Sequence, residues 1–190
     1  MDIRNIIETA LRTTVAQPDE GSTTGQKHRN RSKNWVEALG AGLREHYNNQ
    51  PNVRVFTKHY GENRLEFGMN EILYDVMVCE TAYTKSATGG KQLAYVTKAL
   101  WQVESEFAKN SRGALYDFNK LVVGTADSKL FVGPITHDVK AFRDCLLPAA
   151  NCCSGEVYLA LLPHPESWCG EGQKPKVTLS RLTNRGWTEA

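Results

Sequence analysis

Apolar and polar residues alternate over residues 100–107, and this stretch organises the interpretation of the chain. Trp101 and Val103 fall on one side of an extended chain, whereas Glu104 and Glu106 fall on the other. The pattern predicts a strand whose apolar face packs on a core. The two carboxylates of the opposite face would lie roughly 7 Å apart along the strand. We therefore expect a cation beside them, either a Lys or Arg side chain or a divalent metal ion.

The rest of the chain alternates between helical apolar spacing and short apolar runs. Helices are predicted over 3–15, 32–48, 114–123 and 136–147, and strands over 53–60, 70–80, 100–107, 129–135, 157–162 and 177–182. Ser32 and Thr136 are expected to cap two of the helices, and Pro148 to end the last. Loops are expected over 17–26 and 84–91, where Gly, Ser and Thr are frequent. This order of elements indicates an α/β fold.

Composition narrows the class of protein. A chain of 190 residues with 41% hydrophobic content suits one domain with a full core. We expect an N-terminal helix and basic linker over 1–31 and a single domain over 32–190, with the first helix docked on that domain or on a second copy. The five cysteines show no zinc-ligand spacing, which favours reduced thiols in a cytosolic protein. No signal peptide or membrane-spanning stretch is evident, so we expect a cytoplasmic protein without a membrane partner.

The predicted strand over 70–80 contains an acidic residue at an unusual place. Asp75 shares one face of that strand with Leu73, Met77 and Cys79. A carboxylate on an otherwise apolar face costs free energy unless it is paired or binds a metal ion. Asp75 is therefore a candidate metal ligand.

The net charge of +2 does not by itself indicate a nucleic-acid-binding protein, so local charge must decide. The densest basic run contains Lys27, Arg29, Arg31 and Lys33. It is interpreted either as a solvated loop or as an arm that contacts phosphates.

With Asp75 in the second strand and Glu104-Ser105-Glu106 in the third, directly before a helix, the order over about 32–162 resembles the core of the PD-(D/E)XK nuclease superfamily. The resemblance implies a restriction-endonuclease-like fold. This is a mixed β-sheet flanked by helices, with an αβββαβ core plus an extra helix and strand.

The resemblance also implies a set of site residues. Asp75 and Glu104 match the positions that bind a divalent ion in that family, and the carbonyl of Ser105 would be a further ligand. A Glu on the first core helix often assists. Glu37 and Glu45 both qualify, and Glu37 is preferred because it lies nearer the helix start.

The sequence departs from the family at one position, because Glu106 stands where a Lys is usual. Some members carry Glu there, and in others the Lys has moved to the following helix. Lys120 is the candidate on that helix, with Lys109 as its rival. Helical spacing puts Lys120 off the apolar face, where its long side chain could reach the carboxylates or only pair with Asp117, three residues earlier. Catalysis by the family's mechanism requires that one of these two lysines reaches the site.

The residue types suit phosphodiester hydrolysis independently of the resemblance. Carboxylate oxygens are the ligands that Mg²⁺ or Mn²⁺ prefers, and a bound metal activates water and neutralises developing charge. We therefore expect a metal-dependent nuclease that cuts DNA through Asp75, Glu104, Glu106 and Lys120. The alternatives are an inactive nucleic-acid-binding or assembly module on the same fold, and an unrelated α/β protein. A homodimer is compatible with the resemblance, because duplex-cutting members often pair their sites.

Other residues are assigned to structure rather than chemistry. His137-Asp138 and His164 near Glu166 fit capping or surface roles better than catalytic dyads. Trp168 and Trp187 could stack on bases, but packing is the simpler interpretation.

Overall fold

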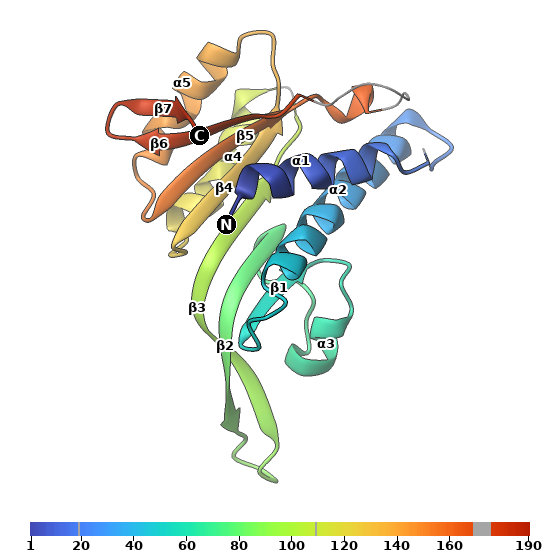
Figure 1. Cartoon of the computed structure of the whole chain (residues 1–190), viewed down its shortest axis with the longest axis vertical. Coiled ribbons are helices and arrows are strands. Elements are labelled where there is room, and N and C mark those ends of the chain that lie inside the picture. Colours follow the sequence, from blue (N-terminus) through green and yellow to red (C-terminus); the bar gives the residue numbers. More distant parts are fainter. Residues whose placement is uncertain (19, 109, 169–175) are drawn as a thin grey trace.

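A computed structural model describes residues 1–18, 20–108, 110–168 and 176–190, and these residues form a seven-stranded mixed sheet that does not close into a barrel (Figure 1). The strands lie in chain order, so each one pairs with the next along the chain. Their bounds are β1 Val53–Thr57, β2 Val76–Lys85, β3 Gln92–Ser105, β4 Ser128–Pro134, β5 Glu156–Leu162, β6 Thr178–Thr183 and β7 Gly186–Glu189. The central pairs β3–β4 and β4–β5 are parallel, and the other pairs are antiparallel. The expected α/β class is therefore confirmed.

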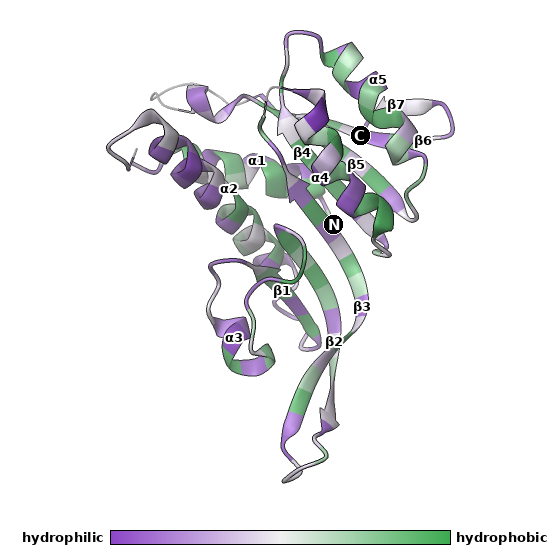
Figure 2. Ribbon diagram, turned by 180° about the vertical axis from the view of Figure 1, so that it is seen from behind, coloured by the Kyte–Doolittle hydropathy of each residue, from purple (hydrophilic) through white to green (hydrophobic). Residues whose placement is uncertain are grey.

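Helices cover both faces of the sheet (Figure 2). On one face lie α1 (Ile3–Val15) and α2 (Thr24–His46), and on the other α4 (Ser111–Val123) and α5 (Val139–Ala150). Each face has its own apolar core. The strand β5 contributes to both cores, because alternate residues point to opposite faces. This confirms the expectation that residues 157–162 are buried on both faces.

The N-terminal segment belongs to the same core. Ile7 and Leu11 of α1 are fully buried with Trp35 and Leu39 of α2, so α1 docks on its own chain. The loop expected over 17–26 is confirmed for the described residues up to Thr23. From Thr24 to residue 31 the expected loop and linker are wrong, because α2 begins at Thr24 and is capped by Thr23 rather than Ser32. The division of the chain at residues 31 and 32 stays a prediction.

Several further boundaries differ from those predicted. β3 runs from Gln92 to Ser105 rather than over 100–107, and β2 continues to Lys85.

β2 begins at Val76, after a bend that includes Leu73 in the left-handed region (φ 60°), so Asp75 lies just before the strand. Leu73 is exposed and does not share an apolar face with Met77 and Cys79, which are buried.

The helix α5 is capped by Asp138 instead of Thr136, and it runs through Pro148. A Pro in the last turn removes few helical hydrogen bonds, because the helix ends two residues later.

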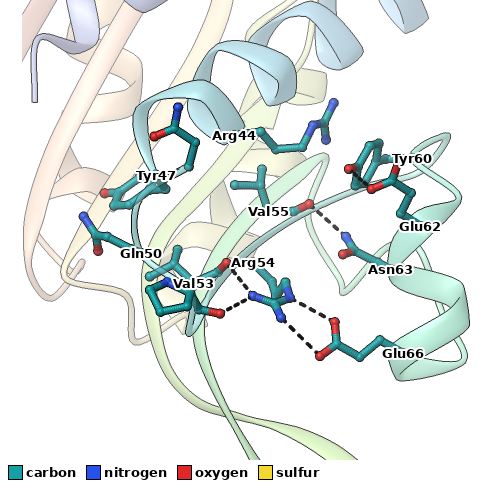
Figure 3. A pocket seen from close by; sticks show the side chains of 12 residues that line it. Arg44, Tyr47, Gln50, Val53, Arg54, Val55, Tyr60, Glu62, Asn63 and Glu66 are labelled. Atoms are coloured by element: carbon teal, nitrogen blue, oxygen red, sulfur yellow. Dashed lines mark hydrogen bonds and ion pairs between the residues drawn. The ribbon is translucent and has the colours of Figure 1, made fainter.

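The short helix α3 (Glu62–Phe67) and the strand β7 were not predicted. Arg54 of β1 holds α3 through a two-pronged bond to Glu66, and Asn63 donates to the carbonyl of Val55 (Figure 3). Because polar contacts hold α3 in place, its sequence shows no helical spacing of apolar residues from which the helix could be predicted.

Two expectations concern the class of the protein as a whole. Within the described residues, no helix is long and apolar enough to cross a bilayer. Cys79, Cys145, Cys152 and Cys153 are free thiols, and Cys169 lies outside the described residues.

Candidate functional site

The carboxyl end of β3 carries a buried carboxylate. Glu104 points to the face of the sheet covered by α4 and is only 2% exposed. Trp101 and Val103 point to the opposite face, towards α1 and α2, so the predicted alternation is confirmed. The Oε1 atom of Glu104 is buried and has no hydrogen-bond partner among the described residues. A buried carboxylate oxygen without a partner is costly, and a bound cation would relieve that cost.

Lys120 of α4 reaches this carboxylate. Its Nζ lies 3.1 Å from Glu104 Oε2 and 2.8 Å from Asp117 Oδ1, one helical turn earlier. Burial opposes the charge of Lys120, but the bonds to Asp117 and Glu104 outweigh burial and raise its pKa. The sequence suggested either that Lys120 belongs to the site or that it pairs with Asp117. The structure shows both contacts at once. The structure adds Asp117 to the site, because the sequence assigned it only to a surface ion pair.

Asp75 lies beside the end of β3. Its Oδ2 accepts a hydrogen bond of 2.8 Å from the backbone N–H of Ser105. Burial raises the pKa of Asp75, although this N–H partly stabilises the charged form. The N–H and C=O of one strand residue point to the same side, so we infer that the Ser105 carbonyl also faces Asp75. That orientation suits the predicted ligand role of Ser105.

Glu106 follows directly after β3. Its backbone N–H bonds to the carbonyl of Val132, and its carboxylate accepts from the N–H of Ala108. Burial raises the pKa of Glu106, and Asp117 beside it adds to the rise. Glu106 is therefore near the site but already has a backbone partner.

The charges of this cluster do not balance. Besides burial, Asp117 raises the pKa of Asp75, Glu104 and Glu106, and Glu71 adds to the rise at Asp75. Among the described residues, Lys120 supplies the ammonium that lowers the pKa of both Asp75 and Glu104. Burial, and then the charge of Asp75, raise the pKa of Glu104 to about 8 even though Lys120 lowers it. A further cation would let these carboxyls ionise together.

The donor set fits a hard divalent ion in chemistry, since Mg²⁺ is bound by one or two carboxylates and retains several waters. Within the described part of the chain, no group of three His, Cys, Asp or Glu side chains is arranged to hold a metal ion. Asp75, Glu104 and the Ser105 carbonyl would therefore need water or phosphate oxygens to complete a coordination shell.

Glu37, the other predicted metal ligand, lies on α2 next to the end of β1. It accepts hydrogen bonds from Thr57 Oγ1 (2.9 Å) and the His59 N–H (3.1 Å), and Arg44 lies 3.9 Å away. Both oxygens of Glu37 thus have partners, and the structure does not bring it to Glu104. Its rival Glu45 is exposed and bonds to Asn48.

A cavity of about 230 Å³ opens on the α2 side of Asp75 and Ser105. Its wall includes Lys33, Lys58 and His59, and also the carboxylate of Glu71. Lys33 belongs to the predicted basic run, whereas Lys58 and His59 were missed because they follow β1 without a basic run of their own. The ammonium groups of Lys33 and Lys58 could contact the phosphates of an anionic substrate, although Glu71 in the same wall offsets part of their charge.

The basic run occupies the first turns of α2, so its side chains point in different directions around the helix. Arg31 donates to the carbonyl of Pro165 at 2.5 Å and so holds the short 3₁₀ turn Pro165–Ser167. Arg29 and Lys33 are exposed, and one turn separates them along the helix. Lys27 is half-buried. The structure therefore favours Arg29 and Lys33 as the members that face an approaching polymer.

Replacing both Arg29 and Lys33 with Gln is expected to weaken DNA binding and to flatten its salt dependence. Each phosphate contact contributes about 0.9 to the slope of log Kd against log salt, so loss of two should lower it by about 1.8. Fluorescence anisotropy from 50 to 300 mM salt measures this slope. The matched control replaces Lys140 and Lys176, which are exposed elsewhere. A slope equal to that of the control would assign the start of α2 to solvent.

The remaining candidates have structural roles. Asp138 caps α5, and His164 caps the 3₁₀ turn. The indole N–H of Trp168 bonds to Pro163 and that of Trp187 to Arg143, which supports packing instead of stacking on bases. Lys109, the rival of Lys120, lies outside the described residues.

The site thus joins the residue before β2, the end of β3 and the last two turns of α4, and its residues come from segments up to 45 positions apart, from Asp75 to Lys120. Comparisons of this chain with models of known protein families, with curated proteins and with solved structures found no match.

Proposed function

We propose that this protein is a divalent-metal-dependent nuclease that hydrolyses DNA phosphodiester bonds. We also propose that its mixed sheet and flanking helices are a variant of the restriction-endonuclease-like fold. The observation that carries the proposal is the buried carboxyl of Glu104, which has one oxygen without a described partner and lies beside Asp75 and Lys120. Such a group is costly in a protein of purely structural role. Perturbed carboxyl groups in a cluster are instead typical of functional sites.

Each residue would have a distinct task. Asp75 and Glu104 would hold Mg²⁺ or Mn²⁺ together with the Ser105 carbonyl. When bound, the metal would lower the pKa of a coordinated water and neutralise charge on the phosphate. Lys120 would hold a phosphate oxygen with its ammonium group, after exchanging part of its contact with Glu104 and Asp117 for the substrate. Glu106 cannot replace a lysine in that task, but its carboxylate could accept the proton of the attacking water.

The substrate would approach over positive side chains. Lys33 and Lys58 line the cavity next to Asp75, and Arg29 lies one turn before Lys33 on α2. Phosphate contacts supply most of the affinity of a protein for DNA of any sequence. This arrangement supports a polymer substrate rather than a small phosphoester.

Incubation of the protein with plasmid, linear duplex and single-stranded DNA tests the proposal. We expect cleavage with Mg²⁺ or Mn²⁺ and none with EDTA. In parallel, millimolar metal should raise the melting temperature, because an ion that binds only the folded state stabilises it. Absence of both cleavage and a thermal shift would reject the metal-dependent reaction.

An inactive nucleic-acid-binding module is the second candidate. It is favoured by the position of the Lys120 ammonium, which is already in contact with two carboxylates, and by Glu106 in place of the expected lysine. This candidate predicts DNA binding that resists EDTA, with no cleavage in any metal.

A further inference from the structure

The strands β2 and β3 extend beyond the sheet as a two-stranded ribbon (Figure 1). β1 pairs with β2 only up to Glu80, and β4 pairs with β3 only from Trp101. Within the part of the chain that the structure describes, the segment 81–98 between these limits therefore has no neighbouring strand on either side. Register shifts at Val78/Cys79 and Glu80/Thr81 mark its base, and bulges of this kind bend a strand pair out of its sheet.

The ribbon is anchored at its base but exposed at its tip. Tyr83 donates to Glu66 of α3, which is itself bound by Arg54 of β1, and Lys98 pairs with Asp127 at 2.5 Å. Beyond Tyr83, residues 84–85 and 91–93 are all exposed. Gly89 and Gly90 form the tip with positive φ angles of 73° and 63°, which suits a tight hairpin turn.

The charge of the ribbon has one sign. Segment 81–98 contains Lys85, Lys91 and Lys98 and no Asp or Glu. Lys85 and Lys91 flank the tip, where Thr88 and Gln92 add uncharged polar side chains. On one face of the pair, Leu93 and Tyr95 remain 44% and 47% exposed. A narrow, cationic, amphipathic ribbon of this kind is complementary to a nucleic-acid groove.

We propose that the β2–β3 ribbon is a groove-binding arm for duplex DNA, with Lys85 and Lys91 on the phosphates of the two groove walls. The major groove of B-DNA is wide enough to admit a two-stranded β-ribbon, whereas that of A-form RNA is too narrow. This inference rests on the proposed function for its choice of polymer.

The length of β2 sets the distance between the tip of the ribbon and the carboxylate cluster. β2 starts next to Asp75, and its ten residues from Val76 to Lys85 span about 33 Å at roughly 3.3 Å per residue. The tip therefore lies about one turn of DNA from the carboxylate cluster. A duplex that contacts both must extend about ten base pairs beyond the phosphate at Asp75 and Glu104.

A second copy of this chain is the competing occupant, because the open edges of the ribbon could pair with another strand. The exposed apolar surface of the ribbon is limited to a few half-exposed side chains, however. A stable dimer usually buries about 1,200–2,000 Å². The absence of acidic residues and the lysines at the tip favour a polyanion instead.

The test is a Lys85→Gln/Lys91→Gln variant, measured by fluorescence anisotropy in EDTA so that binding is independent of cleavage. We expect its affinity for a 30-base-pair duplex to fall about tenfold, through loss of two phosphate contacts, and its affinity for a 10-base-pair duplex to change little. The matched control is Lys140→Gln/Lys176→Gln, which removes the same charge elsewhere. Both side chains of the ribbon variant are exposed, so its melting temperature should equal that of the wild type.

The outcomes separate this proposal from the proposed function. A ribbon variant that binds like the control would overturn the arm even if the wild type cleaves DNA. Loss of self-association in place of DNA binding would assign the ribbon to a dimer contact, and equal binding of duplex RNA would also reject groove recognition. Selective loss of long-duplex binding in a protein that cuts nothing would support the arm and reject the nuclease.

Discussion

Replacing Glu104 with Gln is expected to abolish metal-dependent cleavage and to make the folded protein more stable at alkaline pH. The substitution keeps the volume of the side chain, and the amide oxygen can still accept from Lys120, which lies 3.1 Å from Glu104 Oε2. It removes the negative charge that would bind the metal. Cleavage with Mg²⁺ or Mn²⁺ and urea unfolding in EDTA are the two measurements.

The pH dependence follows from the raised pKa of this carboxyl. Glu104 binds its proton more tightly in the folded state than in the unfolded state, so its stabilising contribution is complete below pH 4.5 and is lost by about pH 8. A pKa moved from 4.5 to about 8 corresponds to at most about 5 kcal/mol of unfolding free energy. Between these pH values the wild type should lose stability relative to the Glu104→Gln variant.

The difference between the two proteins isolates Glu104 from other titrating groups. Near pH 5 their unfolding free energies should be similar, and above pH 8 the variant should be the more stable by several kcal/mol. Millimolar metal should stabilise the wild type at pH 8 and leave the variant unchanged. If the difference in unfolding free energy between the two proteins stays constant from pH 5 to 9, the pKa of Glu104 is not raised in the folded state.

Asp75→Asn is the companion variant. Its side-chain oxygen can keep the 2.8 Å bond from the Ser105 N–H, so the fold should persist while one metal ligand is lost. Removing the charge of Asp75 should also lower the pKa of Glu104, because Asp75 is the largest charged contribution to its rise. Wild-type cleavage in Asp75→Asn would remove Asp75 from the site.

Local sequence patterns predicted the centre of the fold better than its edges. Alternation over 100–107 placed Glu104 opposite Trp101 and Val103, because both faces of β3 are packed and the period of two is strict. The start of α2 was missed because residues 24–34 are mostly polar, and Arg31 among them bonds to the 3₁₀ turn. Without an apolar stripe, the capping by Thr23 was the one local sign of a helix.

The candidate site shows the same limit. Helical spacing correctly identified Lys120 as able to reach the carboxylates, since α4 follows β3 directly and packs on it. Asp117 was treated as a surface partner, because sequence spacing shows that two side chains are near each other but not that both lie beside a buried third. Glu37 was assigned to the metal from the resemblance, and its bonds to Thr57 and His59 depend on a long-range fold contact.

Lys120→Ala should lower kcat by roughly 10²–10³ while metal binding persists, which is the size of effect seen when one stabilising donor is removed from a reaction centre. The physical reason is that Lys120 is the single described cation in contact with Glu104, so no neighbour can replace its charge on the phosphate. Single-turnover cleavage at saturating metal measures the chemical step. Titration of the melting temperature with Mn²⁺ measures metal binding separately.

Two further variants make this test specific. Lys120→Met keeps most of the aliphatic stem and should match Lys120→Ala in rate. Lys140→Ala removes a lysine from an exposed ion pair on α5 and should cleave like the wild type.

Loss of Lys120 should also raise the pKa of Glu104 further, because the hydrogen bond and the charge of Lys120 now lower that pKa. The metal would then compete with a more tightly held proton, so the pH at which half-maximal cleavage is reached should move upward. Near-normal turnover in Lys120→Ala with an unchanged pH profile would leave the ammonium a structural partner of Asp117, and Lys109 would be the next lysine to replace.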